Sequence, residues 1–271
     1  MHNHMHYETI LYEASEHIAT ITLNRPERLN AFNKKMTDEL KHAWEQVKTD
    51  REIRCAIVTG AGEKAFCTGV DVTGYIEEGD FERARQPQST PDFLTLTAIQ
   101  NQCWKPVITA INGMVVGGGL HFIAGGDITV CADTATFFDT HVAVGKVSGL
   151  ESVELLRRIP FEAVARLVLL GGAERMSAAQ AKDVGLVSEV VPATELMQRA
   201  RQLAGYIAAG SPAAVANTKR AMWQSLEGGL GEGLDNAWEI ICEHNSHPDN
   251  EEGPLAKYEK RVANWKPFEH P

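Results

Sequence analysis

Short apolar runs rich in β-branched residues recur along the first half of the chain and constrain the fold more than any other feature. The runs are HIATITLNR (17–25), RCAIVTGAG (54–62), KPVITAING (105–113) and DITVCAD (127–133). Segments of helical period lie between them: MTDELKHAWEQVKTD (36–50), with a candidate cap at Thr37, and DFLTLTAIQNQ (92–102). Strands that alternate with helices need crossover connections, which predicts an α/β fold with a largely parallel sheet.

The pattern changes after LVSEVVP (186–192), where strand signals stop and helix-period segments follow to the end of the chain. We therefore predict a core over residues 1–195 and a C-terminal helical region over residues 196–271. The helical region carries many large apolar side chains: Met222, Trp223, Trp238, Ile240, Ile241 and Trp265. These side chains either meet another subunit or pack on the parent sheet. Residues 77–89 are polar and weakly periodic, and are predicted to form a mobile loop that helps to shape the acyl site.

Composition narrows the class of protein. The chain has 271 residues, 44% of them hydrophobic, which is enough for one substantial core. A net charge of −10, with basic residues scattered among acidic ones, argues against a nucleic-acid partner. Five widely spaced cysteines without a CxxC motif favour reduced thiols and a cytoplasmic location. The sequence indicates neither a signal peptide nor a membrane span, since no window approaches eighteen uninterrupted apolar residues.

Three consecutive glycines, Gly117 to Gly119, stand in VVGGGLHFIAGGDI (115–128), directly after a predicted strand. Their backbone N–H groups are unpaired where a helix begins, and without Cβ atoms a substrate can approach the backbone closely. The spacing matches neither GxGxxG nor a P-loop, so a nucleotide site is disfavoured. Tight helix–strand packing is the alternative reason for these glycines.

A second glycine-containing turn lies in KAFCTGVDV (64–72) and follows another predicted strand. Turns that end neighbouring parallel strands can direct their N–H groups at one point. Two converging N–H donors are what a developing oxyanion requires. The two turns together are thus a candidate site for carbonyl chemistry.

Five motifs then occur in a specific order: LNRPERLNAF, IVTGAGEKAFCTGVDV, KPVITAINGMVVGGG, AERMSAAQAKDVGLVSEVVP and YEKRVANW. In that order they resemble the crotonase family, the enoyl-CoA hydratase/isomerase proteins, over residues 7–265. The resemblance implies a spiral of ββα units with a C-terminal helical domain, assembled as a trimer or a dimer of trimers. It also implies a substrate that is an acyl-CoA thioester, with CoA as part of the substrate, no permanently bound cofactor and no metal.

The resemblance also assigns roles to particular positions. Val70 and Gly118 match the two peptide N–H donors that hold the thioester carbonyl and stabilise the enolate. The positions that match contacts with CoA are Glu27, Arg28, Leu29, Thr68 and Lys260. Many members have a lysine where this chain has Glu27, so attraction to the CoA phosphates must come from elsewhere, and Arg28 is adjacent. Lys260 matches a position that often reaches the nucleotide of CoA, sometimes from a neighbouring subunit.

The chain departs from the family at both catalytic positions, where hydratases carry two glutamates and this sequence has His121 and His141. One neutral and one protonated imidazole can serve as base and acid, so hydration or isomerisation through an enolate is possible. A histidine can also activate water for hydrolysis of a thioester or of a C–C bond in a 1,3-dicarbonyl, a retro-Claisen reaction. A catalytically silent acyl-CoA binder is the third alternative. The acidic residues expected to orient the rings are Asp139, Glu151 and Glu154.

Overall fold

The computed structural model describes residues 6–73 and 95–268, and the predicted loop at 77–89 lies outside them. The four predicted strands are confirmed as β2 (Ile18–Leu23), β3 (Cys55–Gly60), β5 (Val107–Ile111) and β7 (Ile128–Ala132). Within the described residues they form a six-stranded sheet in the order β1-β2-β3-β5-β7-β10, flanked by β1 (Ile10–Ser15) and β10 (Glu189–Val191). All neighbours pair in parallel except β1, which pairs antiparallel with β2. The α/β fold with a largely parallel sheet is thus confirmed.

A smaller sheet is formed by strands that follow those of the large sheet along the chain. Its order in the described part is β4-β6-β8-β9, with β4 (Ala65–Cys67), β6 (Met114–Val116), β8 (Thr136–Phe138) and β9 (Met176–Ser177). Each of β3, β5 and β7 in the large sheet is followed directly by β4, β6 or β8 in the small one. This is a spiral of ββ-helix turns. Because β4 and β6 are parallel neighbours, the chain leaves both at the same edge, which places the two glycine-containing turns side by side.

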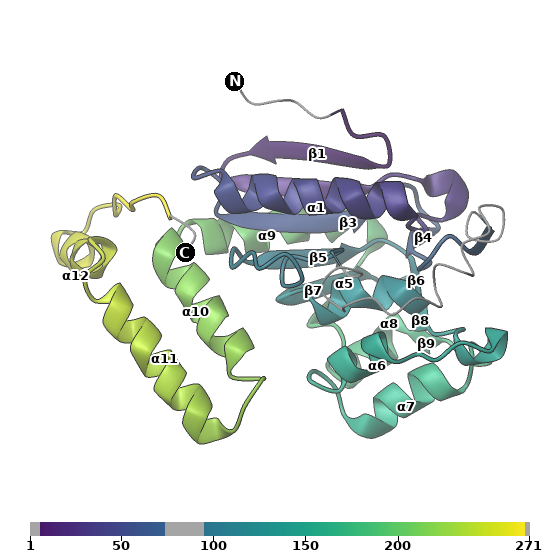
Figure 1. The fold of residues 1–271 in the computed structure, drawn as a ribbon. Coiled ribbons are helices and arrows are strands. Elements are labelled where there is room, and N and C mark those ends of the chain that lie inside the picture. Colours follow the sequence, from purple (N-terminus) through teal and green to yellow (C-terminus); the bar gives the residue numbers. More distant parts are fainter. Residues whose placement is uncertain (1–5, 74–94, 269–271) are drawn as a thin grey trace.

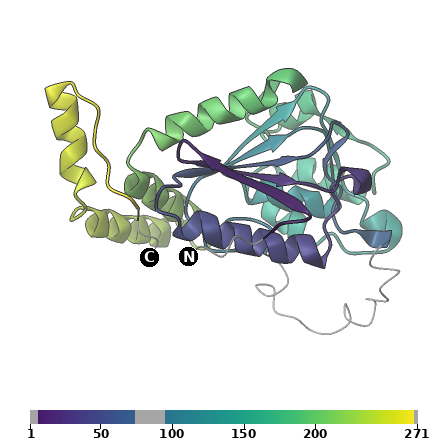
Figure 2. The same ribbon diagram turned by 90° about the horizontal axis from the view of Figure 1, so that it is seen from above.

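Helices cover both faces of the large sheet, as Figure 2 shows, with α1 on one side and α9 on the other. Helix α1 (Lys34–Thr49) buries Leu40, Trp44 and Val47 in the main core. Its N-cap is Asn33, whose side chain accepts the Met36 N–H, and the Thr37 cap predicted from the sequence is wrong. Thr37 lies in the first turn, where its hydroxyl donates to the Asn33 carbonyl. Asparagine is the stronger cap, and it sits one residue before the helix.

The helix predicted at 92–102 is not present over its described part, residues 95–102, which form bends and turns. The Gln100 side chain accepts the backbone N–H groups of Leu96 and Thr97, and the Trp44 indole donates to the Leu96 carbonyl. Gln102 adopts a left-handed conformation with φ of 53°, which breaks the helical run. Side-chain hydrogen bonds to the backbone have replaced the helical ladder that the apolar period predicts.

The remaining described helical elements follow the spiral and the C-terminal region. They are η1 (Pro26–Arg28), η2 (Gly117–Leu120), α5 (His121–Ala124), η3 (Val142–Val144), α6 (Leu150–Leu155), α7 (Phe161–Leu169), α8 (Ala178–Asp183), η4 (Ala193–Glu195), α9 (Leu196–Ala208), α10 (Pro212–Gln224), α11 (Leu230–His244) and α12 (Asp249–Glu259). The short elements from η2 to α6 lie beside the small sheet (Figure 1) and carry the site described below.

The C-terminal helices divide into two groups. Helix α9 packs its alanines Ala200 and Ala204 against the large sheet, whereas α10, α11 and α12 extend to one side of the spiral (Figure 1). An ion pair of 2.8 Å between Lys219 Nζ and Asp127 Oδ2 fixes α10 to the start of β7, and the Trp223 indole donates to the other oxygen of Asp127 at 2.7 Å. A domain boundary at residue 195 stays a prediction, and the helices that stand apart from the sheet begin with α10.

Candidate active site

The two glycine-containing turns lie in contact. A Cβ atom built on Gly69 would lie 2.9 Å from the Gly118 nitrogen and 3.0 Å from the Val116 carbonyl oxygen. Gly69 has φ of +85°, a conformation that favours glycine. A residue with a side chain at position 69 would therefore force the two turns apart.

The direction of the Val70 N–H is set by hydrogen bonds between its neighbours and Phe32. Phe32 N–H donates to the Gly69 carbonyl at 2.8 Å, and the Phe32 carbonyl accepts the Asp71 N–H at 2.9 Å. The Gly69 carbonyl and the Val70 N–H belong to one trans peptide unit, so they point in opposite directions. The Val70 N–H therefore points away from Phe32. The Phe32 ring also lies against Gly118, 2.8 Å from where a Cβ of that glycine would be.

A largely buried ion pair fixes this turn. The Arg25 guanidinium donates to Asp71 Oδ2 at 2.7 Å and to the Ala31 carbonyl at 2.6 Å. The pair joins the LNRPERLNAF segment to the residue that follows Val70. Asn30, which is fully buried in the left-handed region, donates to the carbonyls of Ala61 and Ala65 and so fixes the same segment to β4.

The positions expected to contact CoA lie in two places. Glu27 and Arg28 are exposed on η1, and Leu29 follows them with φ of 52°. The Thr68 hydroxyl donates to the Leu29 carbonyl at 3.3 Å, so the structure brings these four residues together. Lys260 is exposed at the end of α12, on the far side of the molecule from β4 within one chain (Figure 1).

His141 lies beside the glycine turn and is held by a carboxylate. Its Nδ1 donates to Asp139 Oδ1 at 2.9 Å, while the buried Asp139 also accepts the His141 backbone N–H and the Ser148 hydroxyl. The hydrogen bond to Asp139 raises the pKa of His141 above its usual value, although burial opposes it. Nδ1 is thus committed as a donor, and Nε2 is the atom left for chemistry. The ring edge is 3.2 Å from where a Cβ of Gly117 would be.

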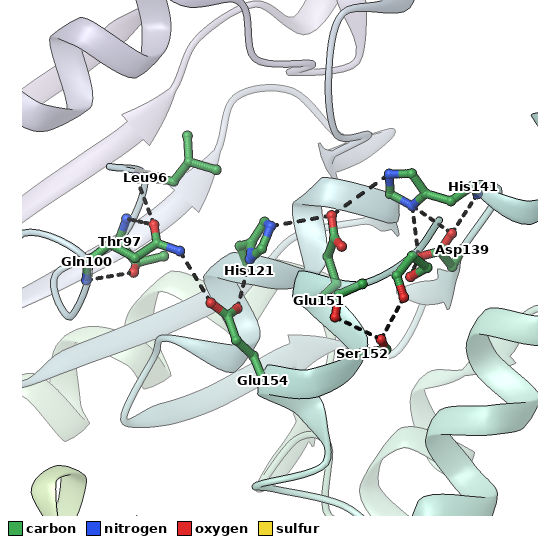
Figure 3. A network of polar contacts seen from close by, with 11 residues as sticks. Leu96, Thr97, Gln100, His121, Asp139, His141, Glu151, Ser152 and Glu154 are labelled. Carbon is green, nitrogen blue, oxygen red and sulfur yellow. Dashed lines mark hydrogen bonds and ion pairs between the residues drawn. The ribbon is translucent and has the colours of Figure 1, made fainter. Parts of the chain in front are cut away.

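His121 is in a different environment. Its ring is buried on α5, with Nδ1 2.7 Å from Glu154 Oε2 and Nε2 3.3 Å from Glu151 Oε1 (Figure 3). Carboxylates only accept hydrogen bonds, so Nδ1 donates to Glu154, and the Glu151 carboxylate beside Nε2 favours the protonated, cationic ring. Burial alone would lower the pKa of His121, but the hydrogen bonds to the two glutamates outweigh it and raise the pKa to about 9. The ring has no open nitrogen for the acid/base role expected of it.

Glu151 connects the two histidines. Its Oε1 is 3.3 Å from His121 Nε2 and 3.8 Å from His141 Nε2 (Figure 3). Burial by itself would raise the pKa of this carboxyl, but the hydrogen bond from His121 and the charges of both histidines hold it below its usual value. The expectation that Asp139, Glu151 and Glu154 orient the two rings is confirmed.

One member of the network was not found from the sequence. Gln100 donates from Nε2 to Glu154 Oε1 at 3.4 Å, and so links the turn at 95–102 to His121 (Figure 3). A glutamine in a segment of apparent helical period carries no signal for such a contact.

Across 6–73 and 95–268, no group of three or more His, Cys, Asp or Glu side chains is arranged to hold a metal ion. None of the helices described here has the length and apolarity to cross a bilayer.

The fold and site define a class of protein with two sheets in a spiral, adjoining glycine turns and ionisable side chains beside them. The sequence profile described as Enoyl-CoA hydratase/isomerase matches residues 13–267. The chain belongs to this enoyl-CoA hydratase/isomerase family, also called the crotonase family, and is an enzyme.

Individual relatives agree with this assignment. The (E)-benzylidenesuccinyl-CoA hydratase of Thauera aromatica is 39% identical over 212 residues, 78% of this chain and 81% of the relative. A probable enoyl-CoA hydratase, echA8, of Mycobacterium bovis is 35% identical over 96% of this chain and 99% of its own. The crystal structure of an enoyl-CoA hydratase/isomerase from Mycobacterium paratuberculosis superposes with a TM-score of 0.85 at 36% identity, covering 96% and 98% of the two chains.

Proposed function

We propose that the protein catalyses reversible hydration of a 2-enoyl-CoA thioester through an enolate. The Val70 and Gly118 N–H groups hold the thioester oxygen, His141 transfers a proton, and His121 is a fixed cation beside the reacting groups. The observation that carries the proposal is the position of His141, whose open Nε2 belongs to a ring that lies against Gly117 of the glycine turn. The printed names of the relatives above, which include hydratases of CoA thioesters, support the same reaction class.

In this reaction the oxygen of water forms a bond to Cβ, and the electron pair of the Cα–Cβ double bond moves to make the enolate. The negative charge on the thioester oxygen is stabilised by the two N–H donors. A base takes one proton from the water and an acid delivers one to Cα. The proposal needs no metal and no permanently bound cofactor, since CoA enters as part of the substrate.

The CoA group would lie along the turn of Glu27, Arg28 and Leu29 and beside Thr68. Arg28 is exposed and can meet a phosphate, which supports this part of the proposal. Because Lys260 lies far from this turn within one chain, its proposed contact with CoA requires a neighbouring subunit.

We also propose a homo-oligomer, a trimer or a dimer of trimers. Large exposed apolar side chains on the C-terminal helices support it: Met222, Leu234, Trp238, Ile241, Leu255 and Tyr258. Light scattering coupled to size-exclusion chromatography gives the mass that decides this point. A cytoplasmic location stays a prediction.

The hydrolase alternative has one observation in its favour. The Asp139–His141 pair is a base oriented by a carboxylate, an arrangement that can also activate water to attack a carbonyl carbon. Such an enzyme would release two fragments from a 1,3-dicarbonyl, or free CoA from an acyl-CoA. A silent acyl-CoA binder would bind CoA without turnover.

The test is to incubate purified protein with 2-enoyl-CoA, β-ketoacyl-CoA and 1,3-diketone substrates and to follow masses. We expect a product heavier by one water from at least one 2-enoyl-CoA. Two fragments, or free CoA, would favour the hydrolase. Binding of CoA without any product would favour the silent binder.

A further inference from the structure

The site contains a carboxylate that stands at neither position where the hydratase pattern has its glutamates. Glu151 lies on α6, ten residues after His141, and reaches between the two rings (Figure 3). Its side chain is only 9% exposed. The two usual glutamate positions are occupied by His121 and His141. The site still contains a carboxylate, because α6 supplies Glu151.

Most polar atoms of this network already have a charged partner, but one pair of atoms faces each other without a hydrogen bond. His121 uses both ring nitrogens on Glu151 and Glu154, and His141 uses Nδ1 on Asp139. The His141 Nε2 and Glu151 Oε1 atoms are 3.8 Å apart, too far for a direct hydrogen bond. One water molecule within about 3 Å of each atom can bond to both of them.

We propose that Glu151 is a catalytic residue that shares the reacting water with His141, an inference that rests on the hydration reaction proposed above. The Glu151 carboxylate takes a proton from the water as its oxygen bonds to Cβ. The His141 imidazolium delivers its Nε2 proton to Cα as the enolate collapses. The site then holds neutral Glu151 and neutral His141, and passage of one proton from Oε1 to Nε2 restores the starting state.

The charges that face these two groups favour that starting state. Glu151 faces the His121 imidazolium from α5, and Glu154, from its own helix, keeps that imidazolium charged. His141 faces Asp139 on one side and Glu151 on the other, with Lys146 opposing their effect. These charges thus favour the anionic form of Glu151 and the protonated form of His141. His121 acts as the counter-ion that keeps the base deprotonated.

The test compares Glu151→Gln with Glu154→Gln, a matched control on the same helix and the same histidine. Glu151→Gln keeps the volume but cannot accept a proton, so we expect kcat to fall by about 10²–10⁴-fold with CoA affinity within about threefold. Glu154→Gln leaves the Glu151 carboxylate in place, and we expect a loss of no more than about fivefold. Wild-type turnover should fall at acid pH as Glu151 is protonated, and this limb should be absent from the residual activity of Glu151→Gln.

Glu151→Asp gives a second measurement if the glutamine variant does not fold. It keeps a carboxylate but withdraws it by one methylene, so we expect a smaller loss of kcat and a retained acid limb. Turnover at the wild-type rate in Glu151→Gln, or an equal loss of kcat in Glu151→Gln and Glu154→Gln, overturns this inference and leaves the proposed hydration reaction standing. Failure of the wild-type chain to hydrate any 2-enoyl-CoA overturns the proposed function and this inference with it.

Discussion

The two sides of the candidate site differ in what forms them: backbone atoms on one side and ionisable side chains on the other. On the side proposed to hold the thioester oxygen, called here the oxyanion side, backbone atoms of Gly69, Val70 and Gly118 are fixed by the pairing of β4 with β6 and by contact between glycines. On the side proposed to transfer protons, called here the acid/base side, His141 and Glu151 stand on short elements and are oriented by opposite charges. The first side depends on the absence of Cβ atoms and the second on which groups carry a proton. Added volume should therefore damage the first, and altered charge the second.

The largest effect on turnover should come from His141→Ala on the acid/base side. Loss of the imidazole removes one proton transfer, for which we expect kcat to fall by about 10²–10⁴-fold. CoA affinity should stay within a few fold, because the turns that would hold CoA and the thioester are unchanged. Steady-state kinetics and calorimetric titration with CoA measure the two quantities. Unchanged turnover would remove His141 from the mechanism.

The oxyanion side is broken by Gly69→Ala. The added methyl would lie 2.9 Å from the Gly118 nitrogen, at a residue whose φ is +85°. Separation of the two N–H donors should lower kcat/KM by about 10²–10³-fold, as for loss of an oxyanion donor.

The control for this variant is Gly205→Ala on α9, where a Cβ meets nothing within 4 Å. Here alanine should raise helix stability by about 0.5–1 kcal/mol and leave kcat/KM unchanged. Thermal unfolding and kinetics on both variants make the comparison. If Gly69→Ala turns over at the wild-type rate, the contact between the turns has no part in catalysis.

The same contrast explains what the sequence could predict. Strand period placed β2, β3, β5 and β7, and the order of the parallel strands placed both glycine turns at one edge. Local pattern failed where side chains bond to the backbone: Asn33 caps α1 in place of Thr37, and Gln100 replaces a helix by a turn.

For the acid/base side, sequence position predicted His121 and His141 as a base and an acid but could not say which ring has which role. Only the fold shows that His121 is enclosed by two carboxylates and that His141 keeps Nε2 open. Glu151 could be named as a neighbour in the sequence. Its position between the rings depends on how α6 packs beside α5, which no local pattern encodes.

A smaller effect is expected from Asp139→Asn, which changes one charge behind His141. Asp139 raises the pKa of His141, so its neutralisation should lower that pKa and leave less imidazolium at alkaline pH. The alkaline limb of the rate profile should therefore move to lower pH, and turnover on the alkaline side should fall further than in the wild type. Kinetics across pH, with NMR titration of the His141 ring, check this. An unmoved alkaline limb would show that His141 is not the acid.

The smallest effect on turnover, a few fold, is expected from His121→Gln, whose main consequence is for stability. The pKa of His121 is about 9 in the folded chain against an ordinary 6.5, so folding favours its protonated form. That stabilisation is fully present below pH 6.5 and is lost as pH rises through 9. A shift of this size corresponds to about 3 kcal/mol in the free energy of unfolding.

Urea unfolding of wild type and His121→Gln at pH 6 and pH 9.5 isolates this contribution, because other titrating groups are shared and cancel in the difference. Wild type should lose about 3 kcal/mol more than the variant between the two pH values. Equal losses would mean that His121 is not held as a cation by Glu151 and Glu154. The acid/base side would then lack the charge that keeps Glu151 ionised. The proposed role of His121 as a fixed cation would be wrong.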